Sequence, residues 1–276
     1  MKNRFKLAAL DLDGTLISAQ GELSSAVRQA IAQVQARGVH VTLATGRRVC
    51  CTVPWAKELN ITIPVVAHNG AVVVDPYSGT ICRQRGISLP VADALVRELQ
   101  RLNLPHLVYR GEDQGEMGFL AARFALHEPE FLAYIDNQLV ITENLALQAD
   151  PIKIAVLAKE DQMRQAVEGW YHRYRDVTNM ITYRSNGYIG VDFVAPNCSK
   201  ASGIGFVLDR LKLDFGDVLA IGDDYNDLEL IQAAGLGVAM GHAPAGVKQY
   251  ADYIAPPGDQ DGAAHVLTKF FLGETE

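Results

Sequence analysis

The apolar positions of this chain fall into two kinds of segment, which together predict a parallel α/β core. Short apolar runs without a helical stripe predict strands, at residues 5–10, 39–44, 64–67, 218–221, 236–240 and 252–255. Apolar residues spaced three or four apart predict helices between them, at about 25–37, 47–59, 200–211, 228–233, 244–250 and 263–271. A strand, helix, strand order closes a right-handed crossover, so neighbouring strands are parallel and the loops after them meet at one sheet edge.

The middle of the chain has a different character and predicts an inserted α+β unit. Its strands are expected at 107–109, 152–157, 177–184 and 188–194, its longer helices at 88–102 and 160–174, and two short helices at 119–126 and 130–134. The pairs Asn69-Gly70 and Asn186-Gly187 stand between apolar runs and predict hairpins. We therefore expect a doubly wound, mostly parallel Rossmann-like core from residues 1–84 and 193–276, with residues 85–192 inserted in it.

Composition and charge narrow the possible partners and the compartment. Lysine and arginine number 25 against 32 aspartates and glutamates, so with a formal net charge of -7 we expect no nucleic-acid partner. No apolar run reaches membrane-spanning length and no cleavable leader is visible, so we expect a cytoplasmic protein without a membrane partner. The four cysteines lack the spacing of a disulfide framework or zinc site and are expected to be reduced thiols.

Two carboxylates, Asp11 and Asp13, follow the first predicted strand directly and precede Gly14. Alternation along an extended chain would point both side chains in the same general direction, where their like charges need a cation or a shared proton. Magnesium fits because it takes oxygen ligands, uses few protein carboxylates and keeps waters that a phosphate oxygen can replace. Taken alone, the same residues are also compatible with an ordinary Asp-Gly turn after a buried strand.

Three further segments add polar groups at the predicted ends of strands and helices. Thr45-Gly46-Arg47 joins a strand to a helix, where amide groups and a hydroxyl can hold a phosphate. Lys200 follows Ser199, a plausible helix cap, and Gly222-Asp223-Asp224-Tyr225-Asn226-Asp227 ends another buried strand. Paired acids, a hydroxyl, a lysine and a second acid cluster suit phosphoryl transfer to a carboxylate.

These four segments closely resemble the four motifs of the haloacid dehalogenase-like phosphohydrolases, in particular the Cof-type subgroup with an inserted IIB cap. In chain order the matching segments are Asp11-Leu12-Asp13-Gly14-Thr15, Thr45-Gly46-Arg47, Lys200, and Gly222 to Asp227. The resemblance covers nearly the whole length. It implies a Mg²⁺-dependent phosphatase that hydrolyses small phosphorylated metabolites, such as hexose phosphates, through an aspartyl phosphate, and that is a monomer or small homo-oligomer.

The resemblance also implies roles for the acids and the lysine. Asp11 would be the nucleophile and a magnesium ligand, and Asp13 would be the general acid and base and give its backbone carbonyl to the metal. Lys200 would bridge Asp11 and a phosphate oxygen. Asp223 would be the third protein ligand of the metal, and Asp227 would act through its water or by orienting Lys200.

The remaining residues of the matching motifs would bind or support the phosphate. Thr45 and the Gly46 amide would hold it, and Asn226 would bond to it. Asn69 resembles a position near the substrate pocket. The supporting residues within the motifs are Asp224 and Arg47.

Two other functions stay open at this point. A phosphosugar mutase of the same family would return the phosphate to a second substrate hydroxyl, and the motifs do not separate it from a hydrolase. A catalytically silent metabolite-binding module would be expected to have lost Asp11, Asp13 or Lys200, and all three are present. One departure concerns the site itself: members commonly show Gly-Asn-Ala where this chain has Gly241-His242-Ala243, so His242 either faces the pocket or is a surface substitution.

Overall fold

The structure is a computed structural model that describes residues 4–18, 21–111, 119–121, 139–141, 147, 149–185 and 187–273. The chain forms two compact units, one of Met1–Arg83 with Ser199–Glu276 and one of Gln84–Cys198. The sequence indicated boundaries after residues 84 and 192. The second junction lies later, after Cys198, because strand β11 (Tyr188–Val194) stays paired to strand β9 (Lys153–Lys159) along its whole length.

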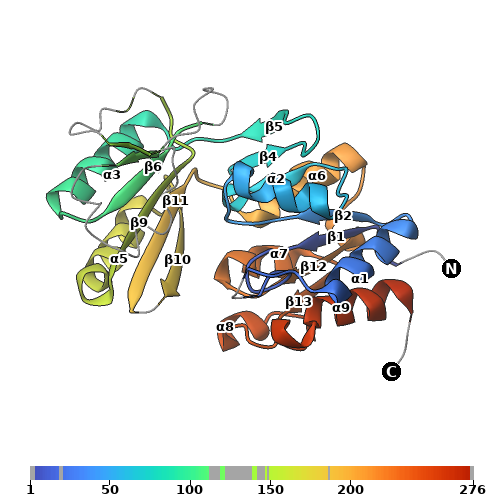
Figure 1. Cartoon of the computed structure of the whole chain (residues 1–276). Coiled ribbons are helices and arrows are strands. Elements are labelled where there is room, and N and C mark those ends of the chain that lie inside the picture. The colour runs from blue at the N-terminus through green and yellow to red at the C-terminus, as the bar shows by residue number, and fades with distance from the viewer. Residues whose placement is uncertain are drawn as a thin grey trace. The chain divides into compact units, whose positions relative to one another are not determined.

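The first unit is built around a five-stranded parallel sheet in the order β14-β13-β12-β1-β2 (Figure 1). Its strands are β1 (Leu7–Leu10), β2 (His40–Leu43), β12 (Val218–Gly222), β13 (Leu236–Ala239) and β14 (Tyr253–Ile254). The central strand β1 is buried throughout, with Leu10 paired to Ile221 on one side and Leu43 on the other. The predicted parallel α/β core is confirmed.

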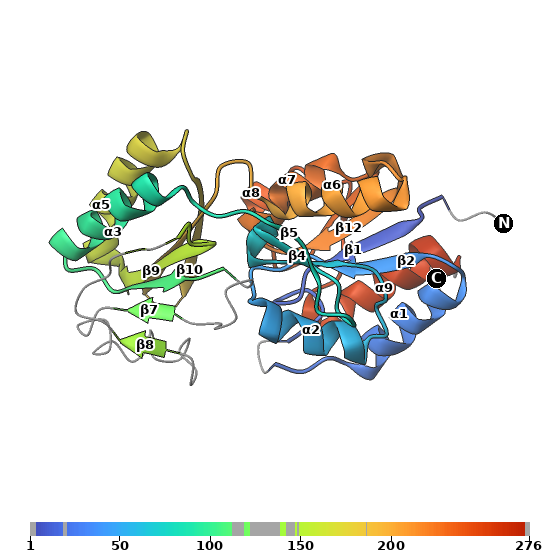
Figure 2. The same ribbon diagram turned by 90° about the horizontal axis from the view of Figure 1, so that it is seen from above.

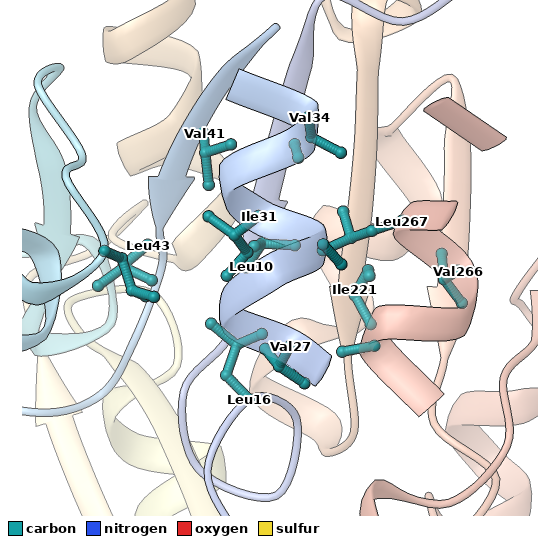
Figure 3. Close-up of a cluster of buried hydrophobic side chains, with 14 of the residues drawn as sticks. Leu10, Leu16, Val27, Ile31, Val34, Val41, Leu43, Ile221, Val266 and Leu267 are labelled. Carbon is teal, nitrogen blue, oxygen red and sulfur yellow. The ribbon is translucent and has the colours of Figure 1, made fainter. Parts of the chain in front are cut away.

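Helices cover both faces of this sheet, as the doubly wound prediction requires. Figure 2 shows α6 (Lys200–Leu211) and α7 (Leu228–Ala233) on one face, and α1 (Ser25–Ala36) and α9 (Gly262–Leu267) on the other. Apolar side chains of α1 and α9 pack on those of β1, β2 and β12 in one buried cluster (Figure 3). The strand residues that alternate with these pack against α6 and α7 instead. Because successive side chains of a strand point to opposite faces of the sheet, each buried strand contributes to a core on each face.

Three further segments complete the first unit. Helix α2 (Val49–Glu58) follows β2, and α8 (Ala245–Lys248) follows β13. Strands β3 (Val65–Ala67), β4 (Val72–Val74) and β5 (Ile81–Gln84) form a separate three-stranded sheet. The hairpin predicted at Asn69-Gly70 is confirmed, because β3 and β4 pair antiparallel across the turn η1 (His68–Gly70).

The second unit is a six-stranded sheet in the order β10-β11-β9-β6-β7-β8. Besides β9 and β11 its strands are β6 (His106–Tyr109), β7 (Phe119–Ala121), β8 (Leu139–Ile141) and β10 (Asn179–Ser185). Helices α3 (Leu89–Arg101) and α5 (Glu160–Tyr174) contribute to a single core cluster with one set of alternating strand residues. Both helices therefore cover the same face of this sheet.

One sequence prediction for the second unit is wrong. Residues 119–126 were expected to be helical, but Phe119–Ala121 is a strand that pairs antiparallel with β6. A short apolar run has no period that separates helix from strand, and here pairing with a distant strand decides. The rest of that segment, the expected helix at 130–134 and Asn186 lie outside the described residues.

Within the part of the chain that the structure describes, no helix has both the length and the hydropathy that crossing a bilayer requires.

Candidate active site

The predicted site residues lie at the carboxyl edge of the parallel sheet in the first unit. Asp11 follows β1, and its backbone N–H donates to the carbonyl of Ile221 on β12 (3.0 Å). Asp223 follows β12, and Lys200 is the first residue of α6. The hydroxyl of Ser199 caps α6 by accepting from the backbone N–H of Ser202 (3.1 Å), which fixes the start of the helix.

Lys200 forms two buried ion pairs, one with each of the two acidic segments. Its Nζ lies 2.7 Å from Oδ1 of Asp11 and 2.7 Å from Oδ1 of Asp227. The side chains of Lys200 and Asp227 are each 1% exposed, and that of Asp11 is 6% exposed. Burial alone would lower the pKa of Lys200, but the two carboxylates outweigh it and raise that pKa above its usual value. Lys200 is therefore a fixed cation that connects β1 to the loop after β12.

Gly14 lets the carboxylate of Asp223 approach the loop after β1. Its φ of +78° is in the left-handed region, and a Cβ there would collide with Oδ2 and Cγ of Asp223. The hydroxyl of Thr15 donates to Oδ1 of Asp223 (3.2 Å). The sequence reading assigned Thr15 no role, although it stands within the first motif. Its contact could not be foreseen because it joins positions 208 residues apart.

Asp227 folds back beneath the end of β12. Its Oδ2 accepts from the backbone N–H groups of Asp223 (3.2 Å) and Asp224 (3.3 Å), while its Oδ1 bonds to Lys200. The carboxylate of Asp224 accepts from the backbone N–H of Tyr225 (2.8 Å) and so starts the short turn Tyr225–Asp227. Both oxygens of Asp227 thus have protein donors, and Asp224 supports the turn that places them.

Burial raises the pKa values of Asp11 and Asp223. Burial is the main cause of the raised pKa of Asp11; Lys200 opposes it, and repulsion from Asp227 and Asp223 adds to it. Burial and repulsion from Asp227 likewise raise the pKa of Asp223 to about 6, against the attraction of Lys200 and His242. One lysine therefore does not neutralise this cluster, and an additional positive charge would stabilise its ionised form.

The acids fit a divalent cation. Asp11, Asp223 and Asp227 each offer a carboxylate oxygen, and these oxygens lie within 4.8 Å of one another. Because both oxygens of Asp227 already accept from Lys200 or backbone N–H groups, Asp11 and Asp223 are the better candidates for direct ligands. Hard oxygen donors and one or two carboxylates per ion are what Mg²⁺ prefers in proteins that bind phosphate.

Asp13 has a different partner from Asp11. Its carboxylate accepts two hydrogen bonds from the guanidinium of Arg47, at 2.8 and 2.6 Å, and its side chain is 58% exposed. Strand β1 ends at Leu10. The chain then turns between Leu12 and Ile17, with the N–H groups of Leu16 and Ile17 donating to the carbonyl of Leu12.

The residues expected to hold a phosphate lie next to one another. A Cβ on Gly46 would lie 3.1 Å from the side-chain amide of Asn69, and that amide accepts from Nδ2 of Asn226 (3.1 Å). The hydroxyl of Thr45 accepts from the backbone N–H of Arg47 (3.2 Å), and Thr45 is fully buried. Helix α2 begins at Val49, later than predicted, so the Thr45-Gly46 loop precedes the helix N-terminus and is not part of it.

His242 reaches the acid cluster, which the sequence left open. Its Nε2 lies 3.5 Å from Oδ2 of Asp223, and its side chain is 40% exposed. The loop after β13 therefore contributes a polar group beside those of the loops after β1 and β12.

Comparisons with known proteins agree with this arrangement. The sequence pattern of the haloacid dehalogenase-like hydrolases matches residues 8–267. The Bacillus subtilis phosphatase YwpJ is 26% identical over 95% of this chain and 98% of that protein. The B. subtilis 5-amino-6-(5-phospho-D-ribitylamino)uracil phosphatase YcsE is 27% identical over 97% of this chain and 96% of that protein. A solved haloacid dehalogenase-like hydrolase from Bacteroides thetaiotaomicron is 27% identical, with a TM-score of 0.79 over 97% of this chain and 100% of that one.

The fold and the site define an α/β protein with a buried cluster of acids and one lysine at the carboxyl edge of its parallel sheet. Because the match spans most of its length, the chain belongs to the haloacid dehalogenase-like hydrolase family, whose members generally use a divalent metal. The resemblance identified from the four motifs is confirmed.

Proposed function

We propose that this protein is a Mg²⁺-dependent phosphatase that hydrolyses small phosphorylated metabolites, with Asp11 as the nucleophile. The observation that carries the proposal is the buried Lys200, bonded to both Asp11 and Asp227 beside Asp223. The enzyme class, a phosphoric monoester hydrolase, is supported by the family and by relatives named as phosphatases.

In the first half of the reaction, a carboxylate oxygen of Asp11 attacks phosphorus and the bond from phosphorus to the substrate oxygen breaks. The protonated carboxyl of Asp13 gives its proton to the departing oxygen, which leaves as an alcohol. Lys200 holds Asp11 through Oδ1 and orients it for the attack. Asp13 must leave Arg47 to reach the substrate, and its exposed position allows that movement.

In the second half, a water molecule gives its proton to the Asp13 carboxylate as its oxygen attacks phosphorus. The bond between phosphorus and Asp11 breaks, which releases inorganic phosphate and restores the Asp11 carboxylate. Asp13 thus acts once as an acid and once as a base, and no net proton is lost from the enzyme.

Asp11 and Asp223 would hold the metal through their side chains, and the resemblance adds the backbone carbonyl of Asp13. When bound, a divalent cation supplies positive charge that stabilises the phosphoryl oxygens in the transition state. Asp227 positions Lys200. The residues proposed to bind the phosphate are Thr45, Gly46, Asn69 and Asn226. The contacts of Asn69 with Gly46 and Asn226 support this assignment.

A small phosphorylated metabolite, such as a sugar phosphate, is the proposed substrate class. YcsE, which is named as the phosphatase of a phosphorylated ribityl compound, matches this chain over almost the full length of both proteins. A cytoplasmic location and a monomer or small homo-oligomer stay predictions.

A phosphate-release screen over sugar phosphates and other small phosphomonoesters, with Mg²⁺ present, tests the proposal. We expect turnover that EDTA stops and added Mg²⁺ restores. Asp11→Asn should abolish turnover of p-nitrophenyl phosphate while it keeps the circular dichroism spectrum of the wild type. Retained activity in Asp11→Asn would remove Asp11 as the nucleophile. Transfer of phosphate to a second substrate hydroxyl without release would favour a mutase.

A further inference from the structure

Cys50 and Cys51 lie side by side in the first turn of helix α2. Their Sγ atoms are 3.7 Å apart, which places the two thiols in contact, and both side chains are partly exposed. The other two cysteines of the chain differ from them. Cys198 is buried, and the thiol of Cys82 donates to the carbonyl of Thr80 (3.6 Å). Cys50 and Cys51 are thus neighbouring thiols that a small solute can reach.

Two features beside this pair favour the thiolate form of Cys51. The backbone N–H groups at the N-terminus of a helix stabilise negative charge, and α2 spans ten residues. The guanidinium of Arg47 is also near. Its hydrogen bond with Asp13 is the main cause of its raised pKa, and attraction to Cys51 adds to the rise. Because this attraction is mutual, it stabilises the Cys51 thiolate as well. The thiolate is the form of cysteine that peroxides oxidise.

Oxidation of the pair by a hydroperoxide takes two steps. The Cys51 sulfur attacks one oxygen of the peroxide, the O–O bond breaks, and the departing oxygen takes a proton from the solvent and leaves as water or an alcohol. Cys51 is then a sulfenic acid. The Cys50 sulfur, 3.7 Å away, attacks the Cys51 sulfur. The S–O bond breaks, and the hydroxyl leaves as water with the proton of the Cys50 thiol. The two thiols are oxidised to one disulfide, and the peroxide is reduced.

A disulfide between these adjacent residues would unwind the first turn of α2. Their Cα atoms are about 3.8 Å apart across one trans peptide bond, below the roughly 4.4 to 6.8 Å that disulfides usually span. The hydrogen bond from the N–H of Cys51 to the carbonyl of Arg48 (3.1 Å) would therefore break. Pro54 lies inside α2 and has no N–H, so this turn lacks the bond that residue 54 of a regular helix gives to the carbonyl of Cys50. Strain also makes a disulfide easy to reduce, so thiols can restore the pair.

The first turn of α2 directly follows a loop that carries groups of the proposed mechanism. The hydroxyl of Thr45 accepts from the backbone N–H of Arg47 (3.2 Å), and the guanidinium of Arg47 holds the carboxylate of Asp13. We propose that Cys50 and Cys51 are a peroxide-reactive pair whose reversible oxidation to a disulfide lowers the activity of the enzyme by displacing this loop. The oxidation itself does not depend on the proposed function, and only the loss of activity rests on it.

Peptide mapping of the full-length protein tests the oxidation. Protein treated with hydrogen peroxide is denatured, alkylated with N-ethylmaleimide and digested with trypsin. The protease cuts after Arg48 and Lys57 and so releases both thiols in one peptide of residues 49–57. We expect this peptide to be unalkylated and lighter by two hydrogens than the reduced peptide, whereas Cys82 and Cys198 are alkylated. Dithiothreitol added before alkylation should restore both thiols of the peptide.

Hydrolysis of p-nitrophenyl phosphate before and after peroxide treatment tests the effect on activity. We expect the disulfide to lower turnover by about tenfold or more, because a small displacement of positioning groups slows the reaction strongly, and dithiothreitol to restore it. Cys51→Ser should keep its activity in peroxide, and Cys82→Ser, the matched control, should lose activity as the wild type does. In Cys50→Ser, dimedone should trap the sulfenic acid on Cys51, because the second thiol is absent.

The possible results separate the two ideas. A disulfide accompanied by a loss of turnover that Cys51→Ser prevents supports the inference. Full alkylation of peptide 49–57 after peroxide treatment, or equal protection by Cys82→Ser and Cys51→Ser, would overturn it. A disulfide in that peptide with unchanged turnover would overturn the proposed effect on activity. If the untreated protein hydrolyses no phosphomonoester yet forms the disulfide, the proposed function fails and the reactive pair stands.

Discussion

Removing the ammonium of Lys200 should destabilise the first unit strongly. Lys200→Met keeps an unbranched side chain of similar length but leaves Asp11 and Asp227 without their shared cation. Those two carboxylates are 6% and 1% exposed, so water cannot replace the lysine. Breaking a buried ion pair by removing one partner costs about 3 to 5 kcal/mol, and we expect a loss in the free energy of unfolding in that range.

Lys6→Met provides a matched control in the same unit. Lys6 pairs with Asp217 at 2.7 Å, the same distance as in the Lys200 pairs, but the Lys6 side chain is 59% exposed. Solvent screens such a pair, so Lys6→Met should hardly move the unfolding midpoint. The two variants therefore compare one ion-pair distance at two levels of burial.

Urea unfolding followed by tryptophan fluorescence can measure the loss of stability in the first unit, which contains Lys200. The chain has two tryptophans, Trp55 on α2 in the first unit and Trp170 on α5 in the second. A Trp170→Phe background makes Trp55 the only reporter. At a slope of about 2 kcal/mol per M, the expected loss lowers the urea midpoint by about 1.5 to 2.5 M.

The pH dependence of Lys200→Met gives a second check. Protonated carboxyls need no cation, so part of the lost stability should return as the pH falls. A Lys200→Met midpoint no lower than that of Lys6→Met would refute the reasoning, because it would mean that the acids do not depend on the lysine.

Three further predictions concern the acids and the loop after β1. In the presence of EDTA, the raised pKa of Asp223, about 6, contributes stability that is complete below about pH 4 and is lost as the pH rises through 6. Between pH 4 and 7 the free energy of unfolding of the wild type should then fall by up to about 3 kcal/mol more than that of Asp223→Asn. Urea midpoints that change with pH by the same amount in both proteins would contradict this. Asp13→Asn should release one equivalent of p-nitrophenolate in a burst and then turn over slowly, because a good leaving group needs no acid but the phosphoenzyme needs a base; stopped-flow absorbance showing a full steady-state rate would remove Asp13 from that role. Gly14→Ala should cost more stability than Gly21→Ala and abolish Mg²⁺ binding, since both glycines have a positive φ, at +78° and +80°, but only Gly14 faces Asp223. In Gly21→Ala the left-handed conformation alone should cost about 1 to 2 kcal/mol. If the two variants lowered the unfolding temperature and the Mg²⁺ affinity measured by calorimetry equally, that result would contradict the proposed collision.

Much of the first unit follows from local pattern. The runs that form β1, β12 and β13 are apolar, β2 is buried after His40, and the helices between the strands carry an apolar stripe. Parallel strands linked by helices bring their carboxyl ends to one edge, which is why the proximity of Asp11 to Asp223 was predictable. The hairpin at Asn69-Gly70 follows from the backbone conformations that those two residues tolerate.

The partners of individual side chains were decided by tertiary structure alone. Asp11 and Asp13 are separated by one residue, yet one is buried against Lys200 and the other is exposed beside Arg47. The strand at Phe119–Ala121 forms because β6 offers it a partner. The contact of His242 with Asp223 also depends on the tertiary structure, because it joins two separate loops.

The sequence by itself therefore determined which residue types gather at this sheet edge, since periodicity and strand ends are local properties of the chain. Which oxygen meets which donor depended on distant contacts: Lys200 meets Asp11 across 189 positions, and Thr15 meets Asp223 across 208. Hydrogen bonds and ion pairs act over a few ångströms in space, and only the folded chain specifies those separations.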